Sequence, residues 1–234
     1  MPKLSSREGL LAREEEITRI LRILLAQKLN FVVIGGYAIA TFRHRFSVDL
    51  DLTMNKKVSK EVGAVLEKED FSEAYAKEIE LLYGEEFKRF SKLVTGLKIY
   101  VDLFVGGVAS RTTDAAWSFD YILHRSRKRS LAGISFFVPE PELLAAMKIH
   151  SGRIADVRDF VALVEKCNFE KLKKHMLRGN LHKLKETLRR EIKVLEKPQF
   201  DDSFKGIFGT HVYKRELVEK AKKVLEKLKR KLSV

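Results

Sequence analysis

The fold is decided by the stretch Phe31-Val-Val-Ile-Gly-Gly-Tyr-Ala-Ile-Ala40, which is followed closely by Arg45-Phe-Ser-Val-Asp-Leu-Asp-Leu52. The apolar run from 31 to 34 has the length of a buried strand, and the glycine pair breaks it. Residues 38–42 then predict the opening of a helix. Residues 48–52 alternate aliphatic and acidic side chains, which predicts a second strand with one buried face.

The two aspartates of this second strand are expected to act together. Because side chains alternate along a strand, Asp49 and Asp51 lie on one face and the aliphatic residues on the other. At about 3.3 Å per residue their Cα atoms are roughly 6.6 Å apart, so both carboxylates can reach one or two divalent cations. A strand, a glycine pair, a helix start and an Asp-x-Asp strand together indicate a site for a nucleoside triphosphate and its metal.

Length and composition predict a globular protein with a substantial core. The chain has 234 residues, of which 45% are apolar, enough for one large domain or two small ones. Cys167 is the single cysteine, so no intrachain disulfide can form, and a reducing cytoplasm is expected. The N-terminus lacks the apolar segment of a signal peptide, and no apolar run approaches the ~20 residues that span a bilayer. We therefore expect no membrane partner.

Positive charge is concentrated in the last third of the chain. The net charge is +14, and residues 166–234 contain 21 Lys or Arg against 9 Asp or Glu, an excess of 12. Such a surplus has two interpretations of similar weight: a solvated helical surface, or a face that binds a polyanion such as RNA.

Periodicity predicts helices and strands for most of the remaining chain. Helices are expected over approximately Ser6–Lys28, Ser59–Lys68 and Phe71–Phe90, the last interrupted near Gly84, and again from Glu142 onward. Strands are expected over Leu97–Val105 and Ile134–Val138. Pro198–Thr210 is interpreted as a loop, Ala109–Ile122 stays unassigned, and the basic cluster His124–Arg129 is either a phosphate contact or an exposed turn.

Asp102 lies alone among apolar residues of the strand predicted over 97–105. An unpaired carboxylate inside a buried strand is costly, so Asp102 needs a partner. A metal shared with Asp49 and Asp51 would supply one, and pairing with a nearby Lys or Arg is the alternative. Three carboxylates on neighbouring strands suit two-metal phosphoryl transfer, which needs no protein nucleophile. The glycine pair lets backbone approach phosphate, and a helix N-terminus offers free N–H groups. His44 is not assigned as a general base.

The ordered set Gly35, Gly36, Asp49, Asp51 and Asp102 resembles the signature of DNA polymerase β-like nucleotidyltransferases. Within that superfamily the chain is most similar to the AbiEii type, which includes the toxins of type IV abortive-infection systems and their tRNA-modifying relatives. The similarity covers roughly residues 31–164. Two blocks support it: Gly-Gly-Tyr-Ala with Arg45-x-Ser47-x-Asp49-x-Asp51, and Lys148 with Arg153-x-x-Asp156-x-x-Asp159.

The resemblance implies roles for nine residues. Asp49, Asp51 and Asp102 would bind Mg²⁺ or Mn²⁺, Lys148 and Asp156 would join them as catalytic residues, and Gly35, Gly36, Arg45, Ser47 and Lys148 would bind the nucleotide. The sequence departs from the group at two positions. Gly36 replaces the serine of many relatives, and Ala155 replaces a lysine, for which Arg153 or Arg158 would have to substitute.

The expected fold is α/β (α+β), with a small mixed sheet flanked by helices and a C-terminal helical domain. The expected domains are a nucleotidyltransferase domain with an N-terminal helix, 1–138, and a basic helical domain, 139–234, with the nucleotide in the cleft between them. The expected activity is transfer of NMP from an NTP to a hydroxyl on RNA such as a tRNA 3′ end, with an antitoxin as partner if the chain is a toxin. The alternatives are transfer to a protein or small molecule, and an inactive homologue that binds nucleotide or RNA.

Overall fold

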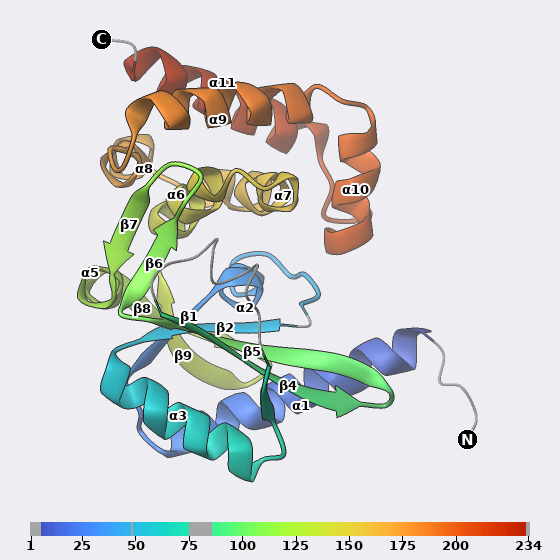
Figure 1. Cartoon of the computed structure of the whole chain (residues 1–234). Helices are drawn as coiled ribbons and strands as arrows, with labels where there is room; N and C mark the ends of the chain where they lie inside the picture. Colours follow the sequence, from blue (N-terminus) through green and yellow to red (C-terminus); the bar gives the residue numbers. More distant parts are fainter. Residues whose placement is uncertain (1–5, 48, 75–85, 233–234) are drawn as a thin grey trace.

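The computed structural model describes residues 6–47, 49–74 and 86–232 (Figure 1). Its centre is a five-stranded mixed sheet in the order β1-β2-β5-β4-β3. β2 and β5 are parallel, and the other neighbours in this sheet are antiparallel. Two further pairs, β6–β7 and β8–β9, are antiparallel hairpins outside it.

The helices and strands have the following bounds. The strands are β1 Phe31–Ile34, β2 Asp49–Met54, β3 Ser72–Ala74, β4 Phe87–Val94, β5 Leu97–Val105, β6 Gly107–Ser110, β7 Ala115–Ser118, β8 Ser126–Leu131 and β9 Ile134–Pro139. The helices are α1 Ser6–Ala26, α2 Gly35–Ala40, α3 Lys56–Lys68, α5 Phe119–His124, α6 Pro141–Ser151, α7 Ile154–Leu163, α8 Phe169–Met176, α9 Leu181–Leu195, α10 Gln199–Phe208 and α11 Arg215–Lys231.

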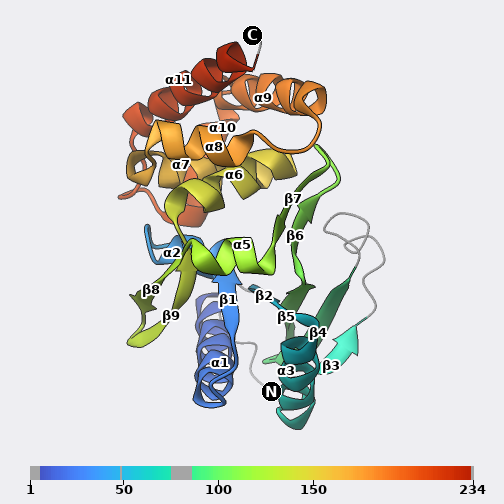
Figure 2. The ribbon, with the colours of Figure 1, turned by 90° about the vertical axis from the view of Figure 1, so that its left-hand side faces the viewer.

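The molecule has a lower and an upper part. α1 and α3 lie below the sheet, and α6 to α11 form a stack above it, with α2 between sheet and stack (Figures 1 and 2). The predicted mixed sheet flanked by helices and followed by a helical region is therefore confirmed. A continuous buried core runs from the α1 face of the sheet to the last helix, and the predicted domain division at 138/139 stays a prediction.

A tight turn sets the register of the hairpin that carries Asp102. β4 and β5 are joined by Thr95 and Gly96, both with positive φ (52° and 80°). Positive φ at both central residues is the requirement of a type I′ turn, whose twist matches that of the flanking strands. Counting back from this turn places Arg89 directly opposite Asp102.

The predicted helix over 71–90 is wrong wherever the structure describes it. Residues 72–74 and 87–94 are strands, and residues 75–85, with Gly84, lie outside the described part of the chain. Phe87 and Phe90 are both buried at a spacing of three, which imitates a helix. The spacing arises because the strand is covered on both faces: Phe87 packs on Phe104, and Phe90 approaches Gly63 of α3.

Four other expectations need correction or completion. The loop expected over 198–210 contains helix α10, whose phenylalanines 200, 204 and 208 recur every four residues and are buried. The unassigned segment 109–122 holds parts of β6 and α5 and all of β7. The basic cluster at 124–129 enters β8, where Arg127, Lys128 and Arg129 are exposed. Helix α2 begins at Gly35 itself, so the glycine pair forms its first turn.

Candidate functional site

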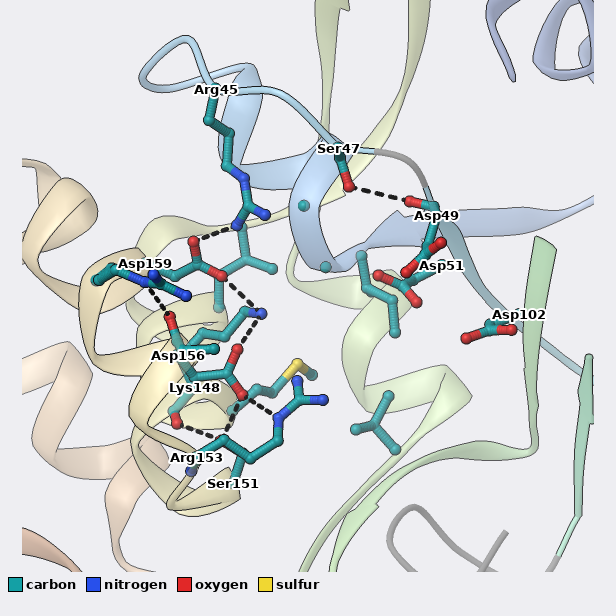
Figure 3. A pocket seen from close by; sticks show the side chains of 18 of the residues that line it. Arg45, Ser47, Asp49, Asp51, Asp102, Lys148, Ser151, Arg153, Asp156 and Asp159 are labelled. Atoms are coloured by element: carbon teal, nitrogen blue, oxygen red, sulfur yellow. Dashed lines mark hydrogen bonds and ion pairs between the residues drawn. The ribbon is translucent and has the colours of Figure 1, made fainter. Parts of the chain in front are cut away.

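A pocket of about 340 Å³ lies between the sheet and the helices above it (Figure 3). Residues from β2, β5 and the segment around α2 line one side, and residues from α6 and α7 line the other. All nine residues singled out from the sequence line it: Gly35, Gly36, Arg45, Ser47, Asp49, Asp51, Asp102, Lys148 and Asp156. Their individual roles stay predictions, but the structure brings them to one place.

The sheet presents its acidic residues in a compact group. Asp51 on β2 lies directly opposite Asp102 on the parallel strand β5. Asp49 precedes Asp51 by two residues, and the two carboxylates lie next to each other in Figure 3. Burial and the charge of Asp102 raise the pKa of Asp51 to about 7, and the same two causes raise the pKa of Asp49. Negative charge at this site is therefore poorly compensated.

Asp102 differs from the other two aspartates because it has a cationic partner. Arg89 Nε donates to Oδ1 at 2.7 Å, and Arg89 Nη2 donates to Oδ2 at 2.5 Å. This two-pronged ion pair is the Lys or Arg alternative that the sequence left open. Burial raises the pKa of Asp102, and the hydrogen bonds and charge of Arg89 oppose that rise.

The helical wall carries a chain of alternating charges (Figure 3). Lys148 Nζ lies 2.7 Å from Asp156 Oδ1 and 2.8 Å from Asp159 Oδ2. Asp159 also accepts a hydrogen bond from Arg45, and Asp156 accepts one from Arg153 at 2.7 Å. Burial alone would lower the pKa of Lys148, but Asp156 and Asp159 raise it by more. The wall therefore holds its lysine charged although it is buried.

The same charges act in reverse on Asp156. Burial would raise its pKa, but Lys148 and Arg153 lower it below the ordinary range. Ser151 Oγ adds a hydrogen bond to Asp156 Oδ2 at 2.5 Å. Asp156 thus organises Lys148, Ser151 and Arg153 at the junction of α6 and α7, and all four residues line the pocket.

The glycine pair is explained by what lies against it. Gly35 has a φ of +61°, and a Cβ there would lie 1.7 Å from Asp51 Oδ2. At Gly36 a Cβ would lie 2.4 Å from Ser47 Oγ and 2.9 Å from Ser47 Cβ. A side chain at position 36 would therefore collide with Ser47, whose hydroxyl donates to the Asp49 carbonyl oxygen at 3.2 Å.

The aspartates on the sheet suit a cation site made of two carboxylates better than one made of three. Over residues 6–47, 49–74 and 86–232, no three acidic, histidine or cysteine side chains are arranged to hold a metal ion. Asp49 Oδ1 is buried, however, and accepts no hydrogen bond from any residue that the structure describes. Carboxylate oxygens are the ligands that Mg²⁺ and Mn²⁺ prefer. Asp49 and Asp51 therefore suit a cation, whereas both Asp102 oxygens are occupied by Arg89.

Sequence reasoning missed Arg89 as a site residue, although a signal was present. The dipeptide Thr95-Gly96 between two apolar runs is compatible with a two-residue hairpin turn. Had 87–94 been interpreted as a strand, counting from that turn would have paired Arg89 with Asp102. Three further residues in and around the second sequence block, Arg153, Ala155 and Arg158, also line the pocket.

No helix in the described part of the chain is long and apolar enough to cross a membrane. The Arg45–Asp159 ion pair joins the segment after α2 to α7. Arg45 and Asp159, which are 114 positions apart in the sequence, both line the pocket.

No protein-family model and no curated protein matches the chain. Solved structures do match it. An inferred nucleotidyltransferase from H. pylori is 14% identical, with a TM-score of 0.50 over 98% of this chain and 98% of its own. The antibiotic-resistance factor ANT(2'')-Ia is 16% identical, with a TM-score of 0.50 over 77% of this chain and 92% of its own. At such low identity the likeness concerns the fold, so the chain has the nucleotidyltransferase fold, and its C-terminal helices are included in the match.

Proposed function

We propose that the chain is a metal-dependent nucleotidyltransferase that transfers NMP from an NTP to a hydroxyl group of RNA, such as a tRNA 3′ end. The observation that carries this proposal is the pocket itself. It places Asp49 and Asp51 on the sheet opposite Arg45, Lys148 and Arg153. The carboxylates that would bind a metal ion therefore face the positively charged side chains that would bind phosphate. This division of charge suits a triphosphate that carries Mg²⁺ or Mn²⁺.

The side chains have distinct tasks in this proposal. Asp49 and Asp51 hold the cation, which when bound polarises phosphate oxygens and favours departure of pyrophosphate. Lys148 and Arg45 bind the triphosphate as fixed positive charges, and Asp159 orients both through ion pairs. Ser47 lies beside the glycine pair and donates its hydroxyl to the carbonyl oxygen of Asp49, and Asp156 positions Lys148. Fixed charges aimed at the phosphates need no rearrangement when the reaction occurs.

RNA is the proposed acceptor because exposed cations gather on the helical part. Arg189, Lys193 and Lys197 follow one another at intervals of four along and just after α9, and all three are exposed. Within the described residues none of the three forms an ion pair, so their charge is available to a polyanion. Transfer to RNA, the AbiEii type with an antitoxin partner, and a cytoplasmic location all belong to this proposal.

Labelling tests the proposed activity directly. The protein is incubated with each α-³²P-labelled NTP, Mg²⁺ or Mn²⁺, and total tRNA, and the label in RNA is measured. We expect incorporation that Asp49→Asn and Asp51→Asn abolish, with Asp202→Asn, an exposed carboxylate on α10, as the matched control. Label that appears in a protein band or a small molecule instead would show that the acceptor is not RNA. No incorporation into any acceptor would refute nucleotidyl transfer.

A further inference from the structure

Asp102 is the middle of a row of three charged residues that crosses the sheet. Strand register places Asp51 of β2 on one side of it and Arg89 of β4 on the other. Directly opposed residues on neighbouring strands point to the same face, so all three side chains share the face that lines the pocket. All three line the pocket, as does Asp49, which starts β2.

The contact between Arg89 and Asp102 is well anchored. Both nitrogens of the guanidinium fork reach one carboxylate oxygen each, at 2.7 and 2.5 Å. The Asp102 side chain is 5% exposed and that of Arg89 is 18% exposed, so solvent screens the pair poorly. The guanidinium also lies 4.5 Å from the ring centroid of Tyr100, which covers one of its faces. The ion pair with Asp102 and the contact with the Tyr100 ring therefore both restrain the Arg89 side chain.

We propose that Arg89 is a positioning residue that occupies Asp102 in place of a divalent cation. The chain without nucleotide then binds one cation, on Asp49 and Asp51, and a second cation binds only when Arg89 leaves Asp102. The proposal rests on the proposed function, because it assigns the cation sites of the same pocket. It also explains why three carboxylates so close in register do not form a cluster in the described structure.

The physical reason is repulsion between like charges. A divalent ion bound to Asp102 would lie within about 5 Å of the guanidinium, where repulsion is only partly screened in a half-buried site. We expect removal of the Arg89 charge to strengthen binding of the second cation by at least about tenfold, which corresponds to about 1.4 kcal/mol. The first cation gains less, because Asp49 and Asp51 make no ion pair with Arg89 among the contacts of the described residues.

The test counts Mn²⁺ bound per chain in the absence of nucleotide, from the electron paramagnetic resonance signal of free Mn²⁺. The wild type is expected to bind one ion, and Arg89→Gln two over the same concentration range. The double variant R89Q/D102N is expected to return to one, because the second site loses its carboxylate. Arg19→Gln is the matched control: Arg19 also pairs with carboxylates, those of Glu16 and Glu69, but on α1 away from the pocket.

Arg89→Gln leaves a buried carboxylate unpaired, so a second variant protects the test against misfolding. The double variant R89Q/D102N removes both charges of the pair, so it leaves no buried charge unpaired, and it is expected to keep the first Mn²⁺. The proposal is overturned if Arg89→Gln binds Mn²⁺ as the wild type does, or if R89Q/D102N loses the first ion. It is also overturned if the wild type binds two ions or none.

Failure of this proposal and failure of the proposed function are distinguishable. Normal labelling of RNA by the wild type, together with an Mn²⁺ count that Arg89→Gln does not change, would refute only the role of Arg89. The expected Mn²⁺ counts without any nucleotidyl transfer would refute only the activity.

Discussion

Gly35→Ala tests the closest contact in the site, and its cost can be worked from the structure. The backbone at Gly35 has a φ of +61°, a conformation that costs a residue with a Cβ about 1–2 kcal/mol. The added Cβ would also lie 1.7 Å from Asp51 Oδ2, 2.6 Å from its Cγ and 3.0 Å from its Cβ. Rotation of the Asp51 side chain relieves the first two contacts but not the third. Overpacking of this kind adds about 1–3 kcal/mol, so the free energy of unfolding should fall by about 2–5 kcal/mol.

The matched control is Gly133→Ala, in the turn between β8 and β9. Gly133 has a φ of +74°, and a Cβ there would meet nothing within 4 Å among the described atoms. The loss of unfolding free energy in this variant therefore measures only the cost of the positive φ, about 1–2 kcal/mol. Urea unfolding of both variants gives the difference, which should be about 1–3 kcal/mol in favour of Gly133→Ala.

A second readout connects Gly35 to the cation site. If a cation binds Asp49 and Asp51, Mn²⁺ should raise the melting temperature of the wild type and of Gly133→Ala by mass action. Gly35→Ala displaces the Asp51 carboxylate, so its melting temperature should respond weakly or not at all. Equal unfolding free energies for the two variants, with equal responses to Mn²⁺, would refute the argument that the glycine is required by Asp51.

Three further predictions concern burial and surface charge. Burial lowers the pKa of His150 to about 4 from an ordinary 6.5, so its stabilising contribution is complete above pH 6.5 and is lost as the pH falls. Between pH 7 and 5 the wild type should lose about 2 kcal/mol more unfolding free energy than His150→Gln, as urea titrations at each pH would measure. Burial raises the pKa of Glu191, so at pH 7 its carboxyl is harder to ionise in the folded protein than in the unfolded one; Glu191→Gln cannot ionise and should stabilise the protein by about 1–3 kcal/mol at pH 7. The gain should shrink as the pH falls toward 4.5, because the unfolded glutamate then also becomes neutral; a variant less stable than the wild type at pH 7 would contradict this. Lys193→Gln should reduce the salt dependence of RNA binding by about 0.7 in log–log slope, whereas Lys60→Gln on α3 should leave it unchanged, and equal slopes for both would argue against the α9 surface.

Local pattern was sufficient for two strands of the central sheet. The strands expected at 31–34 and 97–105 have the observed bounds, because compact apolar runs between glycines or turns leave little choice. Pattern failed where burial had a different origin. Phe87 and Phe90 are buried on a strand covered from both faces. α10 contains Gly206, is followed by Gly209 and begins after Pro198, and these three residues together resemble a loop.

The site shows the same division between local and tertiary information. The spacing Asp49-x-Asp51 and the glycine pair are local, and they identified residues that do line one pocket. The partner of each charge was not local. Asp102 is paired with Arg89 across a hairpin, and Lys148 lies between Asp156 and Asp159 because the turn after α6 brings α7 back beside it.

By itself the sequence determined which acidic and basic residues are available, and it placed two carboxylates on one strand face, because strand periodicity is a property of neighbouring residues. Only the tertiary structure decided how those charges pair. Strand register set Arg89 against Asp102 and left Asp49 without a cationic partner among the described residues. The packing of α7 set Asp159 between Arg45 and Lys148. Ion pairs depend on distances of a few ångströms between residues far apart in the chain, and those distances exist only once sheet and helices have packed.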